Sequence, residues 1–167
     1  MMIGVIADTH GLLRPEVLEL FRDVSLIIHA GDIGTPDVLD TLREVAPVHA
    51  VRGNVDKGAW GTSLPQTEVV ECNGIFIYLL HDVNTLDLDP VAAGMQVVIS
   101  GHSHRPGEAR KNSVLYLNPG SAGPRRFKLP ITAALLRIDE SGAISWKIIE
   151  LERRTDHENF DGTDVTR

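Results

Sequence analysis

The stretch Ile3-Gly4-Val5-Ile6-Ala7-Asp8-Thr9-His10 shows how this chain is organised, because a short apolar run gives way abruptly to polar side chains. Such a run is typical of a buried β-strand, and open α/β sheets place their ligands at strand ends. The same transition recurs at four later blocks: Gly31-Asp32, Gly53-Asn54-Val55-Asp56, His81-Asp82 and Gly101-His102-Ser103-His104. The sequence therefore predicts that these polar blocks emerge together.

The donor atoms of these blocks suit metal ions. They come from two carboxylates, one carboxamide and four imidazoles: Asp8, Asp32, Asn54, His10, His81, His102 and His104. Any one Asp or Gly after a strand is ordinary turn chemistry, but nitrogen and oxygen donors in this combination are usual ligands of Zn, Mn, Fe or Ni. Asp32 is the natural bridge, since a carboxylate can use its two oxygens on two cations. We therefore expect two divalent ions.

Composition indicates one globular domain. The chain has 167 residues, of which 43% are apolar and 23% charged, and a chain of this length can bury a core without disulfides. The single cysteine, Cys72, cannot form an intrachain disulfide and suits a reducing compartment. We expect it to be a small buried or half-buried strand residue. The formal net charge of −7 argues against strong nucleic-acid binding through a broad basic face.

The opening apolar run, Met1 to Ala7, has no basic leader and no small-residue cleavage site. It therefore predicts a first strand and not a signal peptide. No stretch approaches the ~20 apolar residues that a membrane span requires. We expect a cytoplasmic protein that does not bind membranes.

The first third of the chain alternates strands with helices. Apolar runs predict strands at 3–7, 25–30 and 48–51, while apolar residues at helical spacing predict helices at 12–21 and 35–45. Such alternation implies a parallel sheet with right-handed crossovers.

The rest of the chain favours β-hairpins. The dipeptide Asn73-Gly74 between two β-rich runs is the preferred sequence of a type I′ turn. We also expect a short helix at 89–94. Further strands are predicted at 67–72, 75–80, 96–100, 114–117, 131–138 and 143–151. The expected architecture is an α/β sandwich of two sheets with helices outside, formed by residues 1–151, and residues 152–167 are expected to form a polar, mobile tail.

The order Asp-x-His, Gly-Asp, Gly-Asn, His and Gly-His-x-His resembles that of the calcineurin-like metallophosphoesterases. The short length resembles their small bacterial and archaeal phosphodiesterase branch. The resemblance extends from Met2 to about Leu151 and includes Asn118-Pro119-Gly120-Ser121. It implies a four-layer αββα sandwich of two mixed β-sheets flanked by helices, and a metal-dependent phosphodiesterase acting on a small phosphate ester.

The resemblance also implies roles for individual residues. By position, Asp8, His10 and His104 would hold the first metal, Asn54, His81 and His102 the second, and Asp32 would bridge them. Hydroxide between the metals would be the nucleophile, and Mn, Ni, Fe, Zn or Co would serve, with Mn favoured. The catalytic set would then be Asp8, His10, Asp32, Asn54, His102 and His104. A homo-oligomer is also suggested by resemblance.

Two positions depart from the family pattern. Val55 stands where many relatives have a histidine that protonates the leaving group, which favours a diesterase over a monoesterase. Asp56 could assist as an acid or could be a turn residue. Asp82 replaces a common glycine and could orient His81 or be solvated. Arg125 and Arg126 could meet a substrate phosphate or be solvated.

The sequence also suggests roles for two other histidines and leaves other functions open. His29 and His49 lie within apolar strands, and we expect either structural roles for them or roles in supporting the metal ligands. The alternative activities are a phosphomonoesterase or nucleotide hydrolase with the same metals. A third possibility is a non-catalytic interaction scaffold, because the eukaryotic retromer subunit resembles this branch.

Overall fold

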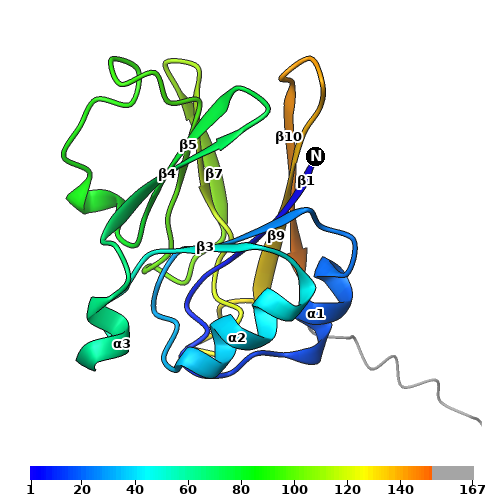
Figure 1. Ribbon diagram of the computed structural model, residues 1–167, viewed down its shortest axis with the longest axis vertical. Coiled ribbons are helices and arrows are strands. Elements are labelled where there is room, and N and C mark those ends of the chain that lie inside the picture. Colours follow the sequence, from blue (N-terminus) through cyan, green and yellow to red (C-terminus); the bar gives the residue numbers. More distant parts are fainter. Residues whose placement is uncertain (152–167) are drawn as a thin grey trace, which may run out of the picture.

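Two five-stranded mixed sheets pack face to face in this protein (Figure 1). The computed structural model describes residues 1–151, so the expected tail at 152–167 lies outside the described residues. The first sheet has the order β10-β9-β1-β2-β3 and the second the order β4-β5-β6-β8-β7. The predicted sandwich of two mixed sheets is confirmed. Within residues 1–151, no helix combines the length and apolar character needed to cross a membrane.

The first sheet is built from the alternating units that the sequence predicts. Its parallel strands are β1 (Met2–Ile6), β2 (Leu26–His29) and β3 (Val48–Ala50), joined by α1 (Pro15–Phe21) and α2 (Pro36–Val45). The antiparallel hairpin of this sheet consists of β9 (Thr132–Ile138) and β10 (Ile144–Glu150).

Helices α1 and α2 cover one face of this sheet. The ring of Phe21 packs against Gly4, where an added Cβ would lie 2.9 Å from three ring carbons. Leu39 and Leu42 of α2 join the same cluster as Ile6 and Ile27 of the sheet. Glycine at position 4 therefore allows α1 to approach β1 closely.

The second sheet carries the Asn73-Gly74 hairpin and a parallel centre. Both turn residues have positive φ, as a type I′ turn requires. The strands are β4 (Thr67–Cys72), β5 (Ile75–Leu80), β6 (Val97–Ile99), β7 (Gly107–Lys111) and β8 (Val114–Asn118). Strands β5, β6 and β8 are parallel, and β4 and β7 are the antiparallel edges.

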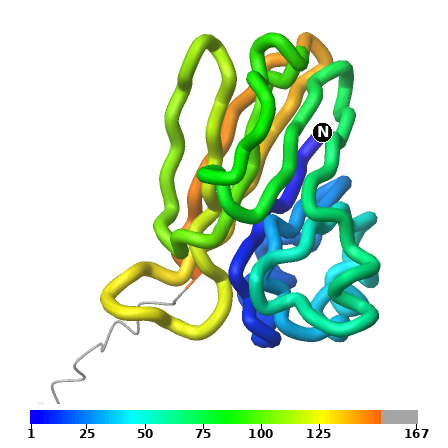
Figure 2. The backbone as a smooth tube through the Cα atoms, turned by 90° about the vertical axis from the view of Figure 1, so that its left-hand side faces the viewer, coloured from blue at the N-terminus to red at the C-terminus, as the bar shows by residue number. Residues whose placement is uncertain are grey.

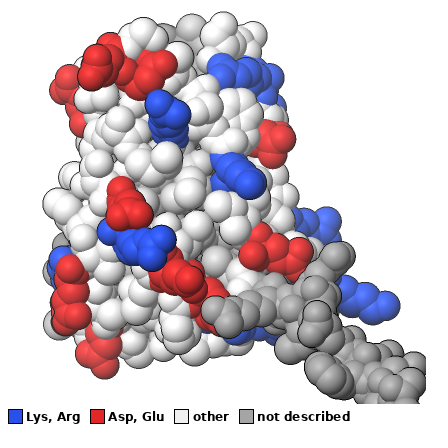
Figure 3. Space-filling view, turned by 90° about the vertical axis from the view of Figure 1, so that its right-hand side faces the viewer, with Lys and Arg blue, Asp and Glu red and all other residues white. Residues whose placement is uncertain are grey.

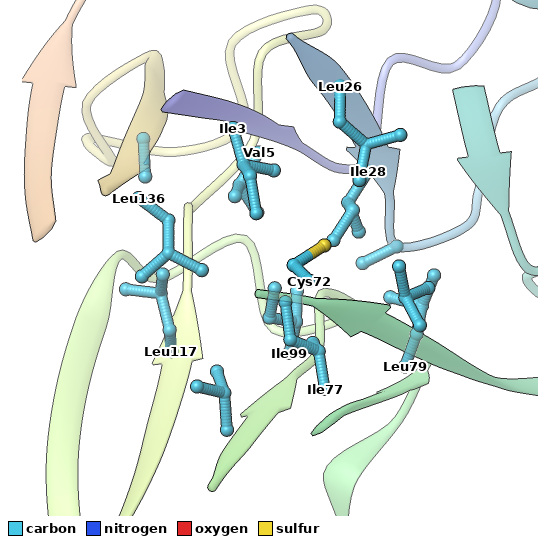
Figure 4. Close-up of a cluster of buried hydrophobic side chains, with 14 of the residues drawn as sticks. Ile3, Val5, Leu26, Ile28, Cys72, Ile77, Leu79, Ile99, Leu117 and Leu136 are labelled. Atoms are coloured by element: carbon cyan, nitrogen blue, oxygen red, sulfur yellow. The ribbon is translucent and has the colours of Figure 1, made fainter. Parts of the chain in front are cut away.

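The main core lies between the two sheets (Figure 4). Ile3, Val5 and Ile28 of the first sheet face Ile77 and Leu79 of the second, and all are fully buried. Cys72 belongs to this core and is 3% exposed, which confirms its expected place in a buried strand. Burial raises the pKa of its thiol.

The outer face of the second sheet is covered by the irregular segment 81–96. Leu86, Leu88 and Met95 pack there against a cluster that includes Tyr78 and Val98. The only regular element of the segment is the 3₁₀ helix η1 (Val83–Thr85). Helices thus flank the first sheet, while this segment takes the corresponding place on the second.

The helix predicted at 89–94 is wrong, because these residues form hydrogen-bonded turns. The Asp89 carboxylate accepts hydrogen bonds from the N–H groups of Val91 and Ala92, and Gly94 has a φ of 74°. Six residues that begin with Asp-Pro and end with Gly are too few to continue beyond one turn.

Besides η1, two elements were not predicted, namely α3 (Gly58–Thr62) and the edge strand β7. The two glycines of α3 lower its intrinsic helix propensity. Four of the five residues in β7 are exposed, so no apolar alternation marks it. Pairing with β8 creates this strand.

Candidate metal centre

The polar blocks meet at one end of the sandwich because they follow strands of both sheets. Asp8 and Asp32 follow β1 and β2, while His81 follows β5 of the second sheet. Backbone hydrogen bonds join the loops: Asp8 N–H donates to Gly31 O at 3.0 Å, and Gly101 N–H donates to His81 O at 2.9 Å. The loop at 119–130, yellow in Figure 2, extends from the same end of the molecule.

One group of four side chains converges tightly. A potential ligand atom of each of Asp8, His10, Asp32 and His104 lies within 4.8 Å of those of the others. Nε2 of His10 is 3.2 Å from Nε2 of His104, which is 3.6 Å from Asp8 Oδ1. The sequence assigned three of these residues to the first metal and Asp32 to the bridge.

A second group lies on the other side of Asp32. Asp32 Oδ1 is 3.4 Å from His81 Nε2, while Asp32 Oδ2 is 3.8 Å from His10 Nε2. The rings of His81 and His102 meet edge to face with centroids 5.1 Å apart. Asn54 Nδ2 lies 3.4 Å from His102 Nδ1. All seven candidate ligands are therefore linked by direct contacts, with Asp32 between the two groups.

Three buried polar atoms in this cluster have no hydrogen-bond partner among residues 1–151: Asp8 Oδ2, His81 Nε2 and His104 Nδ1. His81 Nδ1 donates to the backbone oxygen of Ala30 at 2.8 Å, so Nε2 carries the lone pair of the neutral ring. Buried polar atoms are rarely left without a partner. A divalent cation beside Asp32 would satisfy His81 Nε2, which faces that carboxylate, so these residues fit the implied metals.

Five of the seven candidate ligands have left-handed backbone conformations. Their φ angles lie between 48° and 68°, a region that residues with side chains rarely adopt; they are Asp8, His10, Asp32, His102 and His104. Strained residues of this kind cluster at functional sites, where the surrounding structure must hold them.

Glycines allow the loops to approach one another. An added Cβ at Gly31 would lie 2.7 Å from His81 Nδ1, and one at Gly53 would collide with Asp32 Oδ1 and its backbone nitrogen. The Gly-Asp and Gly-Asn pairs of the sequence therefore reflect close contact between loops as well as turn chemistry.

Burial dominates the electrostatics of the first group. It raises the pKa of Asp8 to about 7 and lowers the pKa of His10. Burial, together with the nearby charge of Arg126, lowers the pKa of His104 to about 4. The imidazoles of His10 and His104 are therefore neutral at pH 7, as metal ligation requires.

The pKa values of Asp32 and His81 shift in opposite directions. Burial alone would raise the pKa of Asp32, but the adjacent His81 imidazole and a hydrogen bond from the Val55 N–H outweigh it and lower that pKa. Burial alone would lower the pKa of His81, but its contacts with Asp32 and with the Ala30 carbonyl raise it.

The Asp56 carboxylate links the loops after β2 and β3 through hydrogen bonds. Its carboxylate is 4% exposed and accepts three backbone hydrogen bonds, from Gly53 N–H at 2.7 Å, Gly34 N–H at 2.9 Å and Ile33 N–H at 3.2 Å. Both of its oxygens are engaged, which favours the turn role over the acid role. Val55 is 41% exposed and offers only its N–H, to Asp32.

Asp82 contacts His102, although the sequence suggested His81 as its neighbour. Asp82 Oδ2 lies 3.7 Å from His102 Nε2, and Asp82 Oδ1 accepts from the backbone and side chain of Asn84 at the start of η1. The irregular segment 81–96 thereby orients an imidazole of the candidate centre.

Asn118 and Ser121 support the centre in ways that sequence reasoning left unassigned. Asn118 Nδ2 donates to Gly101 O at 2.8 Å and to Ser103 Oγ at 3.1 Å, which holds the His-x-His loop. Ser121 Oγ donates to the backbone oxygen of Asp8 at 3.0 Å. The available signal was the Asn-Pro-Gly-Ser segment directly after a predicted strand.

The loop after Ser121 carries two positively charged residues, Arg125 and Arg126. Arg126 is exposed. Its charge adds to the effect of burial in lowering the pKa values of His10 and His104, and it opposes the rise that burial causes in the pKa of Asp8. Arg125 Nη1 donates to the backbone oxygen of Leu129. Arg126, one of the two arginines that the sequence singled out, acts electrostatically on the candidate ligands.

The two strand histidines have structural contacts, as expected. His29 is fully buried; its Nε2 lies 2.9 Å from Thr9 Oγ1, and its Nδ1 accepts from Gly31 N–H. His49 Nδ1 is 2.6 Å from Glu68 Oε1, a contact between β3 of one sheet and β4 of the other.

Comparisons with known proteins agree on one family. A probable metallophosphoesterase of Methanothermobacter thermautotrophicus is 39% identical over 151 residues, which cover 83% of this chain and 87% of the relative.

Two solved structures share the fold at 24% identity. For an archaeal phosphodiesterase the TM-score is 0.73, and the match covers 89% of this chain and 100% of the phosphodiesterase chain. For Vps29 of Entamoeba histolytica complexed with zinc the TM-score is 0.70, and the match covers 91% of this chain and 100% of the Vps29 chain. The model of the calcineurin-like phosphoesterase superfamily domain matches residues 1–141. This chain belongs to the calcineurin-like phosphoesterase superfamily.

Proposed function

We propose that this chain is a phosphodiesterase that hydrolyses a small phosphate ester with two divalent cations. The observation that carries the proposal is the position of Asp32, whose Oδ1 faces His81 and whose Oδ2 faces His10. One carboxylate thus faces two imidazole pairs, which are His10 with His104 and His81 with His102. Two groups of donors around a shared carboxylate favour two ions over one.

The seven side chains would divide between the ions. Asp8, His10 and His104 would hold one cation, Asn54, His81 and His102 the other, and Asp32 both. When bound, the cations polarise phosphoryl oxygens and make a water molecule nucleophilic at neutral pH. Donors of these types accept Mn, Fe, Co, Ni or Zn, and we favour Mn.

The protein's own residues prepare the site in three ways. The Ala30 carbonyl fixes His81 in the tautomer that leaves Nε2 free. Asp56 holds the loop that carries Asn54. Burial lowers the pKa values of His10 and His104, which keeps the imidazoles of both residues neutral. The site is therefore organised before substrate arrives.

The preference for a diester follows from the lack of a proton donor next to Asn54. Val55 has no titratable group, and the Asp56 oxygens are occupied by backbone N–H groups. A substrate whose leaving group departs without general acid catalysis suits such a site.

We do not expect nucleic acid to be the substrate. Among the coloured residues on the face shown in Figure 3, acidic and basic side chains are interspersed and form no extended basic patch. Together with the net charge of −7, this surface favours a small phosphate ester over a long polyanion.

The test compares bis(4-nitrophenyl) phosphate and 4-nitrophenyl phosphate side by side. Chelation should abolish turnover of the diester, and Mn²⁺ or Ni²⁺ should restore it. A higher kcat/KM for the monoester would favour the phosphomonoesterase alternative. No turnover of either ester by fully metallated protein, above that of free metal, would favour the interaction scaffold.

A further inference from the structure

A cavity of about 360 Å³ adjoins the candidate metal centre. Asn54 and His81 form part of its wall, and its volume falls in the range of clefts that bind small ligands. Most of the remaining wall consists of polar or charged side chains: Arg52, Gln66, Thr67, Asp82, Thr85 and Asp87. A group attached to a phosphate at the metal centre could extend into this space.

Among the described residues of the cavity wall, Arg52 is the only arginine or lysine, and its guanidinium has no hydrogen bond or ion pair within residues 1–151. Its backbone N–H donates to Pro65 O at 2.9 Å, which anchors the residue where β3 leads toward α3. The side chain is partly buried. A partly buried guanidinium with five unused donors is a binding group for ligand oxygens.

Two carboxylates line the same cavity without neutralising Arg52. Asp87 has no hydrogen-bond or ion-pair partner among the described residues, and Asp82 directs Oδ2 toward His102. Guanidinium groups only donate hydrogen bonds and carboxylates only accept them. A ligand that satisfies both must itself donate and accept at neighbouring positions, as hydroxyl groups do.

The wall is poorly suited to a nucleobase or an aryl group. Among the described residues that line the cavity, the only aromatic ring is the His81 imidazole, which the proposed function assigns to a metal ion, and none is Phe, Tyr, Trp or an aliphatic residue. Binding of a base usually relies on an aromatic side chain on which the base can stack. The polar wall therefore favours a hydroxylated substituent.

We propose that this cavity binds the organic substituent of the phosphate ester, that this substituent is a polyhydroxy group such as a glycerol or sugar unit, and that Arg52 is a specificity-determining residue. The inference rests on the proposed function, because it requires the phosphoryl group to bind at the neighbouring centre. Arg52 donates to substituent oxygens, and Asp87 accepts from its hydroxyl groups.

The test measures binding of two phosphonates to Mn²⁺-loaded protein by calorimetry. Methylphosphonate carries only the phosphoryl-like group, whereas 3,4-dihydroxybutylphosphonate adds two hydroxyl groups on a short chain. Neither C–P bond is hydrolysed, so binding is measured without turnover. We expect the dihydroxy ligand to bind about 10-fold more tightly, which corresponds to one or two additional net hydrogen bonds.

Arg52→Ala should remove most of this preference and change methylphosphonate binding less. Arg52→Lys keeps the charge but loses the planar fork, and should retain part of the preference. Arg43→Ala is the matched control, because Arg43 is an exposed arginine paired with Asp40 on α2. Both dissociation constants should be unchanged in that variant.

Asp87→Ala separates direct contact from long-range charge. Loss of an acceptor should lower the preference for the dihydroxy ligand, whereas a purely electrostatic role would make both ligands bind more tightly. The inference is overturned if wild type binds both ligands equally or if Arg52→Ala keeps the full preference. In either case, Mn²⁺-dependent methylphosphonate binding would leave the proposed function standing. Absence of that binding, together with absence of turnover, would overturn both.

Discussion

The Asp32 carboxylate lies 3.4 Å from Nε2 of His81, and its second oxygen lies 3.8 Å from Nε2 of His10. The two imidazoles come from loops that follow strands of different sheets. A single carboxylate therefore connects the two sheets at the candidate metal centre, and its removal should affect both groups of ligands.

Metal stoichiometry tests this connection directly. Wild-type protein prepared with excess Mn²⁺ should approach two ions per chain, as measured by elemental analysis. Asp32→Ala should lower the affinity at both positions, whereas Asn54→Ala should affect mainly one. Asp139→Ala, at a half-buried turn carboxylate remote from the cluster in sequence, is the control. A wild-type plateau at one ion per chain would contradict the binuclear proposal.

Val55→His should help poor leaving groups more than good ones. Without a donor at this position, wild-type rates should fall steeply from nitrophenyl to alkyl diesters. General acid catalysis is worth about 10²–10⁴-fold where proton transfer is needed, so a histidine should flatten that dependence. Metal content must match wild type for the comparison to hold. Equal effects of the substitution on both classes of ester would indicate that another acid already acts.

Asp56→Ala should destabilise the fold and loosen the candidate centre. The buried carboxylate accepts three backbone hydrogen bonds, and hydrogen bonds to charged groups contribute about 1.5–3 kcal/mol each. Because losses in one network are not additive, we expect a loss of about 3 kcal/mol in the free energy of unfolding, measured in urea. Asp56→Asn keeps one acceptor oxygen and should lose less. A variant as stable as wild type but without activity would instead indicate a role as an acid.

Acid should destabilise the metal-free protein through His29. Burial lowers the pKa of this imidazole from 6.5 to about 3. Thr9 Oγ1 donates its only proton to Ile33 O, so it accepts from His29 Nε2, while Nδ1 accepts from Gly31 N–H. The Gly31 contact requires the neutral ring, because Nδ1 must keep its lone pair to accept.

Between pH 6.5 and about 3, the unfolded chain therefore binds one more proton at His29 than the folded chain. Stability should fall as pH falls through this window, by up to about 1.4 kcal/mol per pH unit from this group. His29→Gln should be less stable at pH 7 and show a shallower decline. Urea unfolding of both proteins with chelator present measures the difference, and parallel slopes would contradict this role.

Local sequence patterns were sufficient to predict most of the strands and helices. The apolar runs that end in polar blocks identified β1, β2 and β3, and the Asn73-Gly74 turn identified the hairpin of β4 and β5. These features are readable because burial and turn chemistry act on neighbouring residues. The types of ligand in each block were equally evident, since donor chemistry belongs to the side chain itself.

Contacts between distant residues were decided only by the tertiary structure. His10 meets His104 across 94 positions, and Asp82 meets His102 where His81 was expected. The exposed strand β7 and the turn at 89–94 carry no burial pattern, so pairing and packing determine them. The cavity beside Arg52 also arises only when the loops after β3 and β5 come together. The sequence by itself determined which chemistry is present, and the packing of the two sheets decided which side chains share a site, because that depends on the register of strands far apart in the chain.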